Sequence, residues 1–282
     1  MTREQFELRL FKVLKWVGIA FFFLISFFPL FWMIVLSFRP LSEVLQRPAD
    51  LPTIDQILKA QPYIGVWVQQ NLGKFLGNSL QVSLSTVIVT VILSILGAYA
   101  VTRLKFRGRG VFNIGILLIY MFPAMILAVP LFVVFTRLGL RNSLFGLVIV
   151  YLAQTLPVSL YMLRSYFQTL PPELEEAALI DGANRFQVIL RVSIPLSVPA
   201  IASVSLYVFM IAWNEFLFAL LWLLERPEVW TISLGVQQLD TQEVPKTWLM
   251  AGSVIITIPI VVLFFFFERF LTRGLTAGAV KG

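Results

Sequence analysis

The chain has 282 residues, of which 59% are hydrophobic and only 13% are charged, with a net charge of +7. A soluble domain carries about 25% charged residues, so this composition excludes an ordinary soluble fold. The sequence contains no cysteine and no histidine, which excludes disulfides, thiolate or imidazole metal sites and histidine-based catalysis. We therefore expect a membrane protein without a metal site, whose positive charge belongs to its loops rather than to a nucleic-acid interface.

Six stretches of mostly apolar residues have the length of about 20 residues that a transmembrane helix needs. They cover residues 16–37, 80–102, 111–136, 143–163, 196–224 and 248–271. The first stretch is too long for a signal-peptide core and lacks a small-residue cleavage site, so we interpret it as a true span. The sequence thus predicts an all-α, polytopic membrane protein with a transmembrane domain over residues 16–271. A short segment, 1–15, precedes this domain, and a tail, 272–282, follows it.

The distribution of basic residues predicts how these spans are oriented. Of the 22 Lys and Arg residues, 14 lie in the N-terminal segment, the second and fourth connections and the C-terminal end. The other eight are spread over the remaining, longer loops. Because cytoplasmic loops carry the excess of positive charge, we expect both termini in the cytoplasm and the protein in a prokaryotic inner membrane as a multi-pass protein.

The fourth connection, residues 164–195, does not look like membrane sequence. Pro171 and Pro172 suit the first turn of a helix, acidic residues follow them, and Gly182 fits a C-terminal cap. A second short helix is predicted around residues 186–190. An amphipathic pair lying on lipid is one interpretation, but the inner leaflet is itself anionic. The acidic residues therefore favour docking into a soluble partner.

This connection resembles the EAA signature of ABC importer permeases. The resemblance rests on Glu176-Ala177-Ala178, on Gly182 and on residues 192–195, where Val and Ile replace the usual Ile and Leu. Residues 37–40, 78–79, 97–99, 213–216 and 273–282 are similar to the carbohydrate-uptake branch, within it to the smaller, six-span permease of maltose-type transporters. The resemblance implies a type I ABC importer transmembrane fold with a cytoplasmic coupling-helix loop.

In that family the loop helix docks into a cleft of an ATPase subunit. The residues that this implies as contacts are Glu176, Ala177, Ala178, Asp181 and Gly182. The chain has no Walker A motif of its own, because Phe75 follows Gly73-Lys74. We therefore expect a non-enzymatic subunit without a cofactor, with ATP and Mg²⁺ bound by a partner ATPase. The implied partners are a second homologous permease, two ATPase subunits, an extracytoplasmic binding protein, membrane lipid and a sugar.

Polar residues inside spans are candidates for the substrate pathway, because they are costly in lipid. Asn214 and Glu215 lie in the fifth predicted span, and Tyr151 and Gln154 lie in the fourth. The alternative is that they pack between helices, which is the commoner fate of a single tyrosine in a span.

The leading hypothesis is a permease subunit that forms half of the pathway for a di- or oligosaccharide, with alternating access driven through the EAA loop. A permease for another solute, such as glycerol phosphate, would favour Arg or Lys in the pathway. A stand-alone secondary transporter would usually carry ionisable residues or repeats for ion coupling. An intramembrane enzyme would need a second catalytic group beside Glu215.

Overall fold

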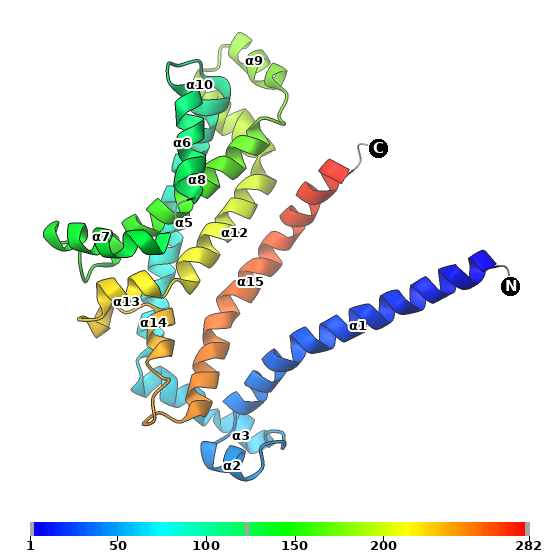
Figure 1. The fold of residues 1–282 in the computed structure, drawn as a ribbon, viewed down its shortest axis with the longest axis vertical. Helices are drawn as coiled ribbons and strands as arrows, with labels where there is room; N and C mark the ends of the chain where they lie inside the picture. Colours follow the sequence, from blue (N-terminus) through cyan, green and yellow to red (C-terminus); the bar gives the residue numbers. More distant parts are fainter. Residues whose placement is uncertain (1–2, 122–123, 280–282) are drawn as a thin grey trace. The chain divides into compact units, whose positions relative to one another are not determined.

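The computed structural model describes residues 3–121 and 124–279, and the elements within these ranges are helical and joined by turns (Figure 1). The long helices are α1 (Arg3–Ser37), α5 (Leu72–Arg103), α8 (Leu144–Phe167), α12 (Val198–Asn214) and α15 (Lys246–Ala279). The shorter helices are α2 (Leu41–Gln46), α3 (Ile54–Lys59), α4 (Gln61–Ile64), α6 (Arg109–Met121), α7 (Ala124–Arg137), α9 (Pro172–Ile180), α10 (Arg185–Val188), α11 (Ile194–Leu196), α13 (Leu217–Leu223) and α14 (Ile232–Gln237). π-Helical turns cover Gly65–Gln69 and Ile189–Ser193, and a 3₁₀ turn covers Pro227–Val229.

Within the described ranges, four helices are long and apolar enough to cross a membrane: α1, α5, α8 and α15. A fifth is added if α12 and the segment Arg185–Leu196 count as one span bent by 82° at Ser197. These helices confirm an all-α, polytopic membrane protein. α5 begins at Leu72, eight residues before the predicted span, and Asn78 and Ser79 in this added part bond to residues 228–232.

The third and fifth predicted spans are not continuous helices in the structure. Residues 111–136 fall on α6 and α7, which run in different directions (Figure 1), and residues 122–123 between them lie outside the described residues. Residues 196–224 are divided between α12 and α13, with a break at Glu215 and Phe216. The length of the apolar stretch alone did not reveal this break, because α12 and α13 are both apolar.

The chain forms two compact units. The first comprises residues Met1–Leu72 and Val236–Thr257, and the second comprises Gly73–Gly235 and Ile258–Gly282. In the second unit, one apolar cluster surrounds Trp222, whose ring meets Phe132 and Phe135 edge-on at centroid distances of 5.9 and 5.4 Å. A second cluster joins α5, α8, α10 and α12 through Tyr99, Phe167 and their neighbours. These clusters fix the ends of the helices that carry the sites described below.

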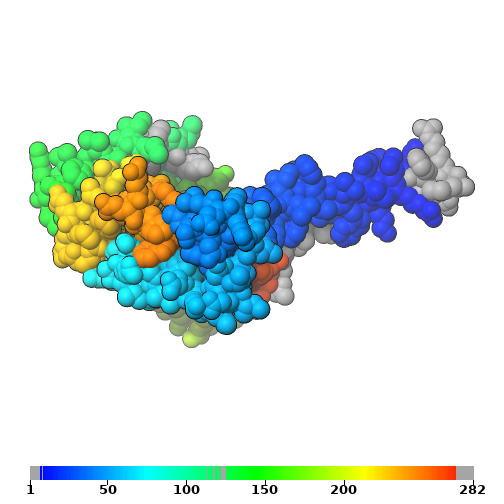
Figure 2. Space-filling model, turned by 90° about the horizontal axis from the view of Figure 1, so that it is seen from below, coloured from blue at the N-terminus to red at the C-terminus, as the bar shows by residue number. Residues whose placement is uncertain are grey.

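In the first unit, a buried arginine organises the long first connection. Arg39 is 2% exposed, and its guanidinium donates hydrogen bonds to the backbone carbonyls of Glu43, Arg47 and Asp50, at 3.3, 2.8 and 2.9 Å. Farther along this connection, α3 begins after a capping box on Thr53. The irregular connection is therefore an ordered surface, which Figure 2 displays in blue and cyan with part of residues 236–245 in orange.

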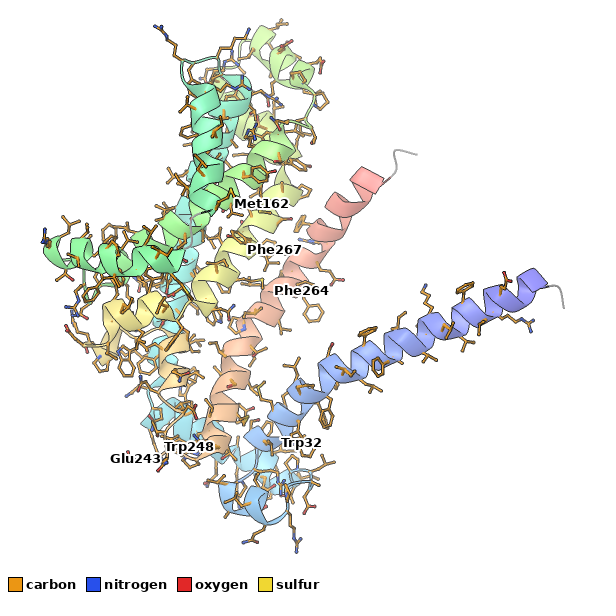
Figure 3. The ribbon with its side chains drawn as sticks, viewed as in Figure 1. Trp32, Met162, Glu243, Trp248, Phe264 and Phe267 are labelled. Carbon is orange, nitrogen blue, oxygen red and sulfur yellow. The ribbon has the colours of Figure 1, made fainter. Side chains whose placement is uncertain are left out.

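The start of α15 packs closely on this connection. Trp248, labelled near the base of α15 in Figure 3, lies so near Gly65 that a Cβ added to Gly65 would overlap the indole ring. Gly65 is needed here for close approach, because its Cβ would occupy the space of the ring.

The first turns of α5 hold another loop in the second unit. Asn78 donates to the carbonyls of Glu228 and Trp230 at 3.1 and 2.9 Å, and the Ser79 hydroxyl accepts from the Ile232 N–H at 2.7 Å. Trp230 in turn donates to the Leu223 carbonyl at 2.9 Å, at the end of α13. Residues 228–232 are thereby tied both to α5 and to α13.

Candidate functional site

The fourth connection folds as two short helices, as predicted. α9 begins at Pro172 with Glu173 and Glu175 in its first turn. At its other end Gly182 adopts φ +88°, and its N–H donates to the Leu179 carbonyl at 3.1 Å. The Ala183 N–H donates to the Ala178 carbonyl at 3.0 Å, which completes a Schellman motif. The predicted glycine cap is confirmed, and it turns the chain sharply into α10.

The predicted contact residues lie on the open side of α9. Glu176, Ala177, Asp181 and Gly182 are exposed, and Ala178 is half-buried. Large apolar side chains accompany them on the α9–α10 surface: Leu174, Ile180 and Phe186 are exposed, Ile180 to 86%. Acidic groups around exposed apolar side chains are unfavourable against an anionic bilayer and suitable for a protein partner.

The opposite side of α9 is fixed by a buried ion pair. The Glu175 carboxylate accepts from Arg103 Nε at 2.9 Å and from the Ser193 hydroxyl at 3.0 Å. Arg103 Nη2 also donates to the carbonyls of Phe167 and Leu170, at 3.0 and 3.1 Å. The side chains of Arg103 and Glu175 are only 13% and 6% exposed. This cluster, which we call the Arg103 latch, joins the ends of α5 and α8 to α9 and to the π-helical turn before α12.

Sequence reasoning missed the latch. Arg103 counted only as one of the basic residues of the second connection, and Glu175 only as one of several acids in the first turn of a helix. One sequence feature could have indicated the latch: Arg103 is a charged residue that directly follows a long apolar span. A pairing across 72 residues is decided by tertiary packing and leaves no periodic pattern.

The second group of predicted residues lies at the break between α12 and α13. Tyr151, fully buried on α8, donates to Glu215 Oε2 at 2.7 Å. The same carboxylate accepts from the N–H groups of Phe218 and Ala219, at 2.8 and 3.1 Å, and so caps the first turn of α13. The Ser233 hydroxyl donates to the Glu215 backbone carbonyl at 2.7 Å. Within the described chain, the Glu215 carboxylate thus bonds α8 to the first turn of α13 at the α12–α13 break.

The other two predicted pathway residues, Asn214 and Gln154, form no hydrogen bond with Tyr151 or with the Glu215 carboxylate among the described residues. The Asn214 amide is exposed and donates to the Met210 carbonyl of its own helix at 2.9 Å. Gln154 lines a cavity of about 270 Å³ between α6, α7, α8, α12 and α13, with Pro157 and Tyr207 nearby. Its Nε2 has no hydrogen-bond partner among the described residues. The other lining residues are mostly apolar, and Gln154 adds an amide to the cavity wall.

Comparison with known proteins assigns this architecture to a family. Residues 90–277 match the model of the binding-protein-dependent transport system inner membrane component. The chain is 40% identical over 271 residues to the inner membrane ABC transporter permease protein YcjP of Escherichia coli, covering 94% of this chain and 95% of that protein. It is 38% identical over 274 residues to the trehalose/maltose transport system permease protein MalG of Thermococcus litoralis, covering 96% and 97%.

A solved structure has the same fold. It is described as a bacterial ABC transporter involved in the import of the acidic polysaccharide alginate. The superposition has a TM-score of 0.83 at 24% identity and covers 96% of this chain and 99% of that one. The fold is therefore that of an ABC importer permease.

The chain belongs to the family of binding-protein-dependent ABC importer permeases. Within it, the chain groups with the carbohydrate-uptake permeases, as the EAA signature and the distributed similarities predicted. It is a non-catalytic, multi-pass subunit of the inner membrane that works with a binding protein, and ATP is handled by a partner ATPase.

Proposed function

We propose that this chain forms half of the translocation pathway for a di- or oligosaccharide, in a transporter with a second permease and two ATPase subunits. The sugar class is supported by relatives whose names specify trehalose and maltose, trehalose, arabinooligosaccharides and diacetylchitobiose. The observation that carries the proposal is the α9–α10 surface, which is exposed on one side and fixed by the Arg103 latch on the other.

In this proposal α9 is the coupling helix. Its exposed residues Glu176, Ala177, Asp181 and Gly182, with half-buried Ala178, face the ATPase cleft. The small side chains permit close approach, Ile180 supplies an apolar anchor, and Glu176 pairs with a basic group. ATP-driven closure of the ATPase dimer then displaces the whole connection from 164 to 195.

The proposed topology has six crossings and places both termini and the α9–α10 connection in the cytoplasm, as in a type I importer. The third crossing is divided between α6 and α7, and the fifth is α12, with α13 turning back at the outer side. The positive-inside distribution supports this orientation. Residues 1–15 form the cytoplasmic N-terminal segment, 16–271 the transmembrane domain and 272–282 the cytoplasmic tail.

Gln154 is the residue we assign to the pathway wall. Its amide nitrogen is unpaired among the described residues, and an amide beside aromatic and proline rings suits sugar hydroxyls. Glu215 and Tyr151 are assigned to the α12–α13 break, because their polar groups already bond to protein. Asn214 is exposed near this break and is assigned to a surface that meets the pathway or the second permease.

Purification from the native membrane tests the assembly. We expect an ATPase and a second permease to accompany the chain, and Ile180→Asp, but not Leu58→Asp on the exposed first connection, to release the ATPase. Reconstituted ATPase activity should then be stimulated by binding protein loaded with a sugar. Stimulation by a phosphorylated solute such as glycerol phosphate and by none of a panel of sugars would replace the sugar assignment. Uptake without ATP or partners would refute the proposal.

A further inference from the structure

The Arg103 latch joins one end of a long, uninterrupted helix to α9. α5 has 32 residues and contains no proline, whereas α8 contains Pro157 and the helix of α12 stops at Asn214. Proline removes a backbone hydrogen bond and allows a helix to bend. Of the helices that the latch joins, α5 is therefore the one best suited to transmit a displacement along its axis.

The far end of α5 is also bonded to the segment that follows the α12–α13 break. Asn78 and Ser79 hold residues 228–232, which bond through Trp230 to the end of α13. Ser79 and Arg103 are about 36 Å apart along the helix axis, at 1.5 Å per residue, which exceeds the thickness of about 30 Å of a bilayer core. One helix thus connects α9 with the segment that follows the α12–α13 break.

A buried ion pair adds little net stability to a fold, so stability alone does not explain the Arg103–Glu175 pair. Removing two charges from water costs about as much as their attraction returns, so an apolar pair of similar volume would hold the fold equally well. Arg103 instead fixes the orientation of its neighbours, because its planar guanidinium donates to a carboxylate and to two carbonyls at the same time. The exposed pair Arg226–Glu228 has the same Nε-to-carboxylate distance of 2.9 Å, but the described residues give the Arg226 side chain no second hydrogen-bond acceptor.

We propose that Arg103 is a positioning residue that fixes α9 to α5, so that displacement of the coupling helix is delivered through α5 to residues 228–232. This inference rests on the proposed function, since it needs an ATPase that moves α9. Glu175 and Ser193 complete the latch, and Asn78 and Ser79 form its distal counterpart. Loss of the latch leaves α9 able to bind the ATPase but unable to move α5.

The test compares Arg103→Lys and Glu175→Gln with Arg47→Lys, on the first connection, in the assembled, reconstituted transporter. Arg103→Lys keeps the charge but loses the fork, and Glu175→Gln keeps the shape but loses the charge. For both latch variants we expect sugar uptake per ATP hydrolysed to fall at least fivefold, with assembly and ATPase rate within twofold of wild type. Arg47→Lys, whose pair with Asp50 is 79% and 55% exposed, should leave the ratio within twofold.

A second readout follows the movement of α5 itself. The chain has no cysteine, and an added side chain at exposed Gly77 meets nothing within 4 Å, so Gly77→Cys supplies a single labelling site near the distal counterpart. We expect ATP binding to change its maleimide labelling rate at least threefold, and Arg103→Lys to remove that change. An unaltered ATP response in Arg103→Lys, or uptake that falls only in proportion to assembled complex, overturns the latch.

The same preparation separates the two proposals. If the wild-type chain binds no ATPase, the proposed function fails. If the ATPase binds and Ile180→Asp releases it, while the latch variants keep the wild-type ratio of uptake to ATP hydrolysis, only the latch fails.

Discussion

Removal of the Glu215 side chain should destabilise the protein at one defined junction. In Glu215→Ala the buried Tyr151 hydroxyl loses its acceptor, and the N–H groups of Phe218 and Ala219 lose their cap. An unsatisfied buried hydroxyl costs about 1–3 kcal/mol, and a lost helix cap about 1 kcal/mol. Because Glu215 is partly exposed, water offsets some of this loss. We expect the free energy of unfolding to fall by about 2–3 kcal/mol.

Milder substitutions separate the free energy of the Tyr151 hydrogen bond from that of the α13 cap. Tyr151→Phe removes only the hydroxyl and leaves Glu215 capping α13, so we expect a loss of about 1 kcal/mol. Glu215→Gln keeps one acceptor oxygen and should cost about 1 kcal/mol. Asn214→Ala is the matched control: among the described residues its exposed amide bonds only within α12, and we expect a change below about 0.5 kcal/mol.

The assay is reversible unfolding in mixed micelles, read by tryptophan fluorescence, combined with uptake by the assembled transporter. If Glu215 serves the α12–α13 junction, uptake per folded molecule should change little in Glu215→Gln and Tyr151→Phe. A Glu215→Ala protein with wild-type stability but a KM for the sugar raised tenfold or more would refute this reasoning. Such a result would return Glu215 to the substrate pathway.

Three further substitutions test the loops. Gly182→Ala should raise amide exchange at residues 182–183 about fivefold, because a left-handed backbone costs an L-residue about 1 kcal/mol while space for the Cβ is free. Gly65→Ala should lower the thermal midpoint, since its Cβ would overlap the indole of Trp248 and overpacking costs about 1–3 kcal/mol. Hydrogen bonds from Asn142 and then Arg141 hold the pKa of the Glu225 carboxyl below its usual range. The contribution of the Glu225 carboxylate to folding stability is therefore present above the unfolded pKa of about 4.3. It is lost as pH falls through the lower pKa of the folded state.

Each of these predictions has a matched comparison. Gly182→Asn should change exchange less than Gly182→Ala, because asparagine tolerates the left-handed region; a larger effect would contradict the backbone argument. Gly77→Ala, at a position with free space, should leave the midpoint unchanged, unlike Gly65→Ala. The thermal midpoint of the wild-type protein should fall between about pH 5 and pH 3 partly because Glu225 becomes protonated. Glu225→Gln should lack this part of the fall. Equal acid sensitivity in that variant would assign the effect to other carboxylates.

The sequence predicted the features that depend on local pattern. Apolar length identified the helices later seen as α1, α5, α8 and α15, and residues 171–182 predicted α9 with its glycine cap. Both signals are local, because a span is set by its solvent and a cap by the dihedral angles of a few residues. The EAA resemblance lies in the same local stretch, which is why the family was recognisable before any contact was known.

Tertiary structure alone decided which polar groups work together. Glu215 looked like an isolated carboxylate in a span, and only the position of Tyr151 on α8 and the start of α13 showed that its oxygens are used. Arg103 and Glu175 are separated by 72 residues and meet because α8 returns the chain to the end of α5. Hydrogen bonds reach only about 3 Å, so such pairings are set by how helices pack rather than by spacing along the chain.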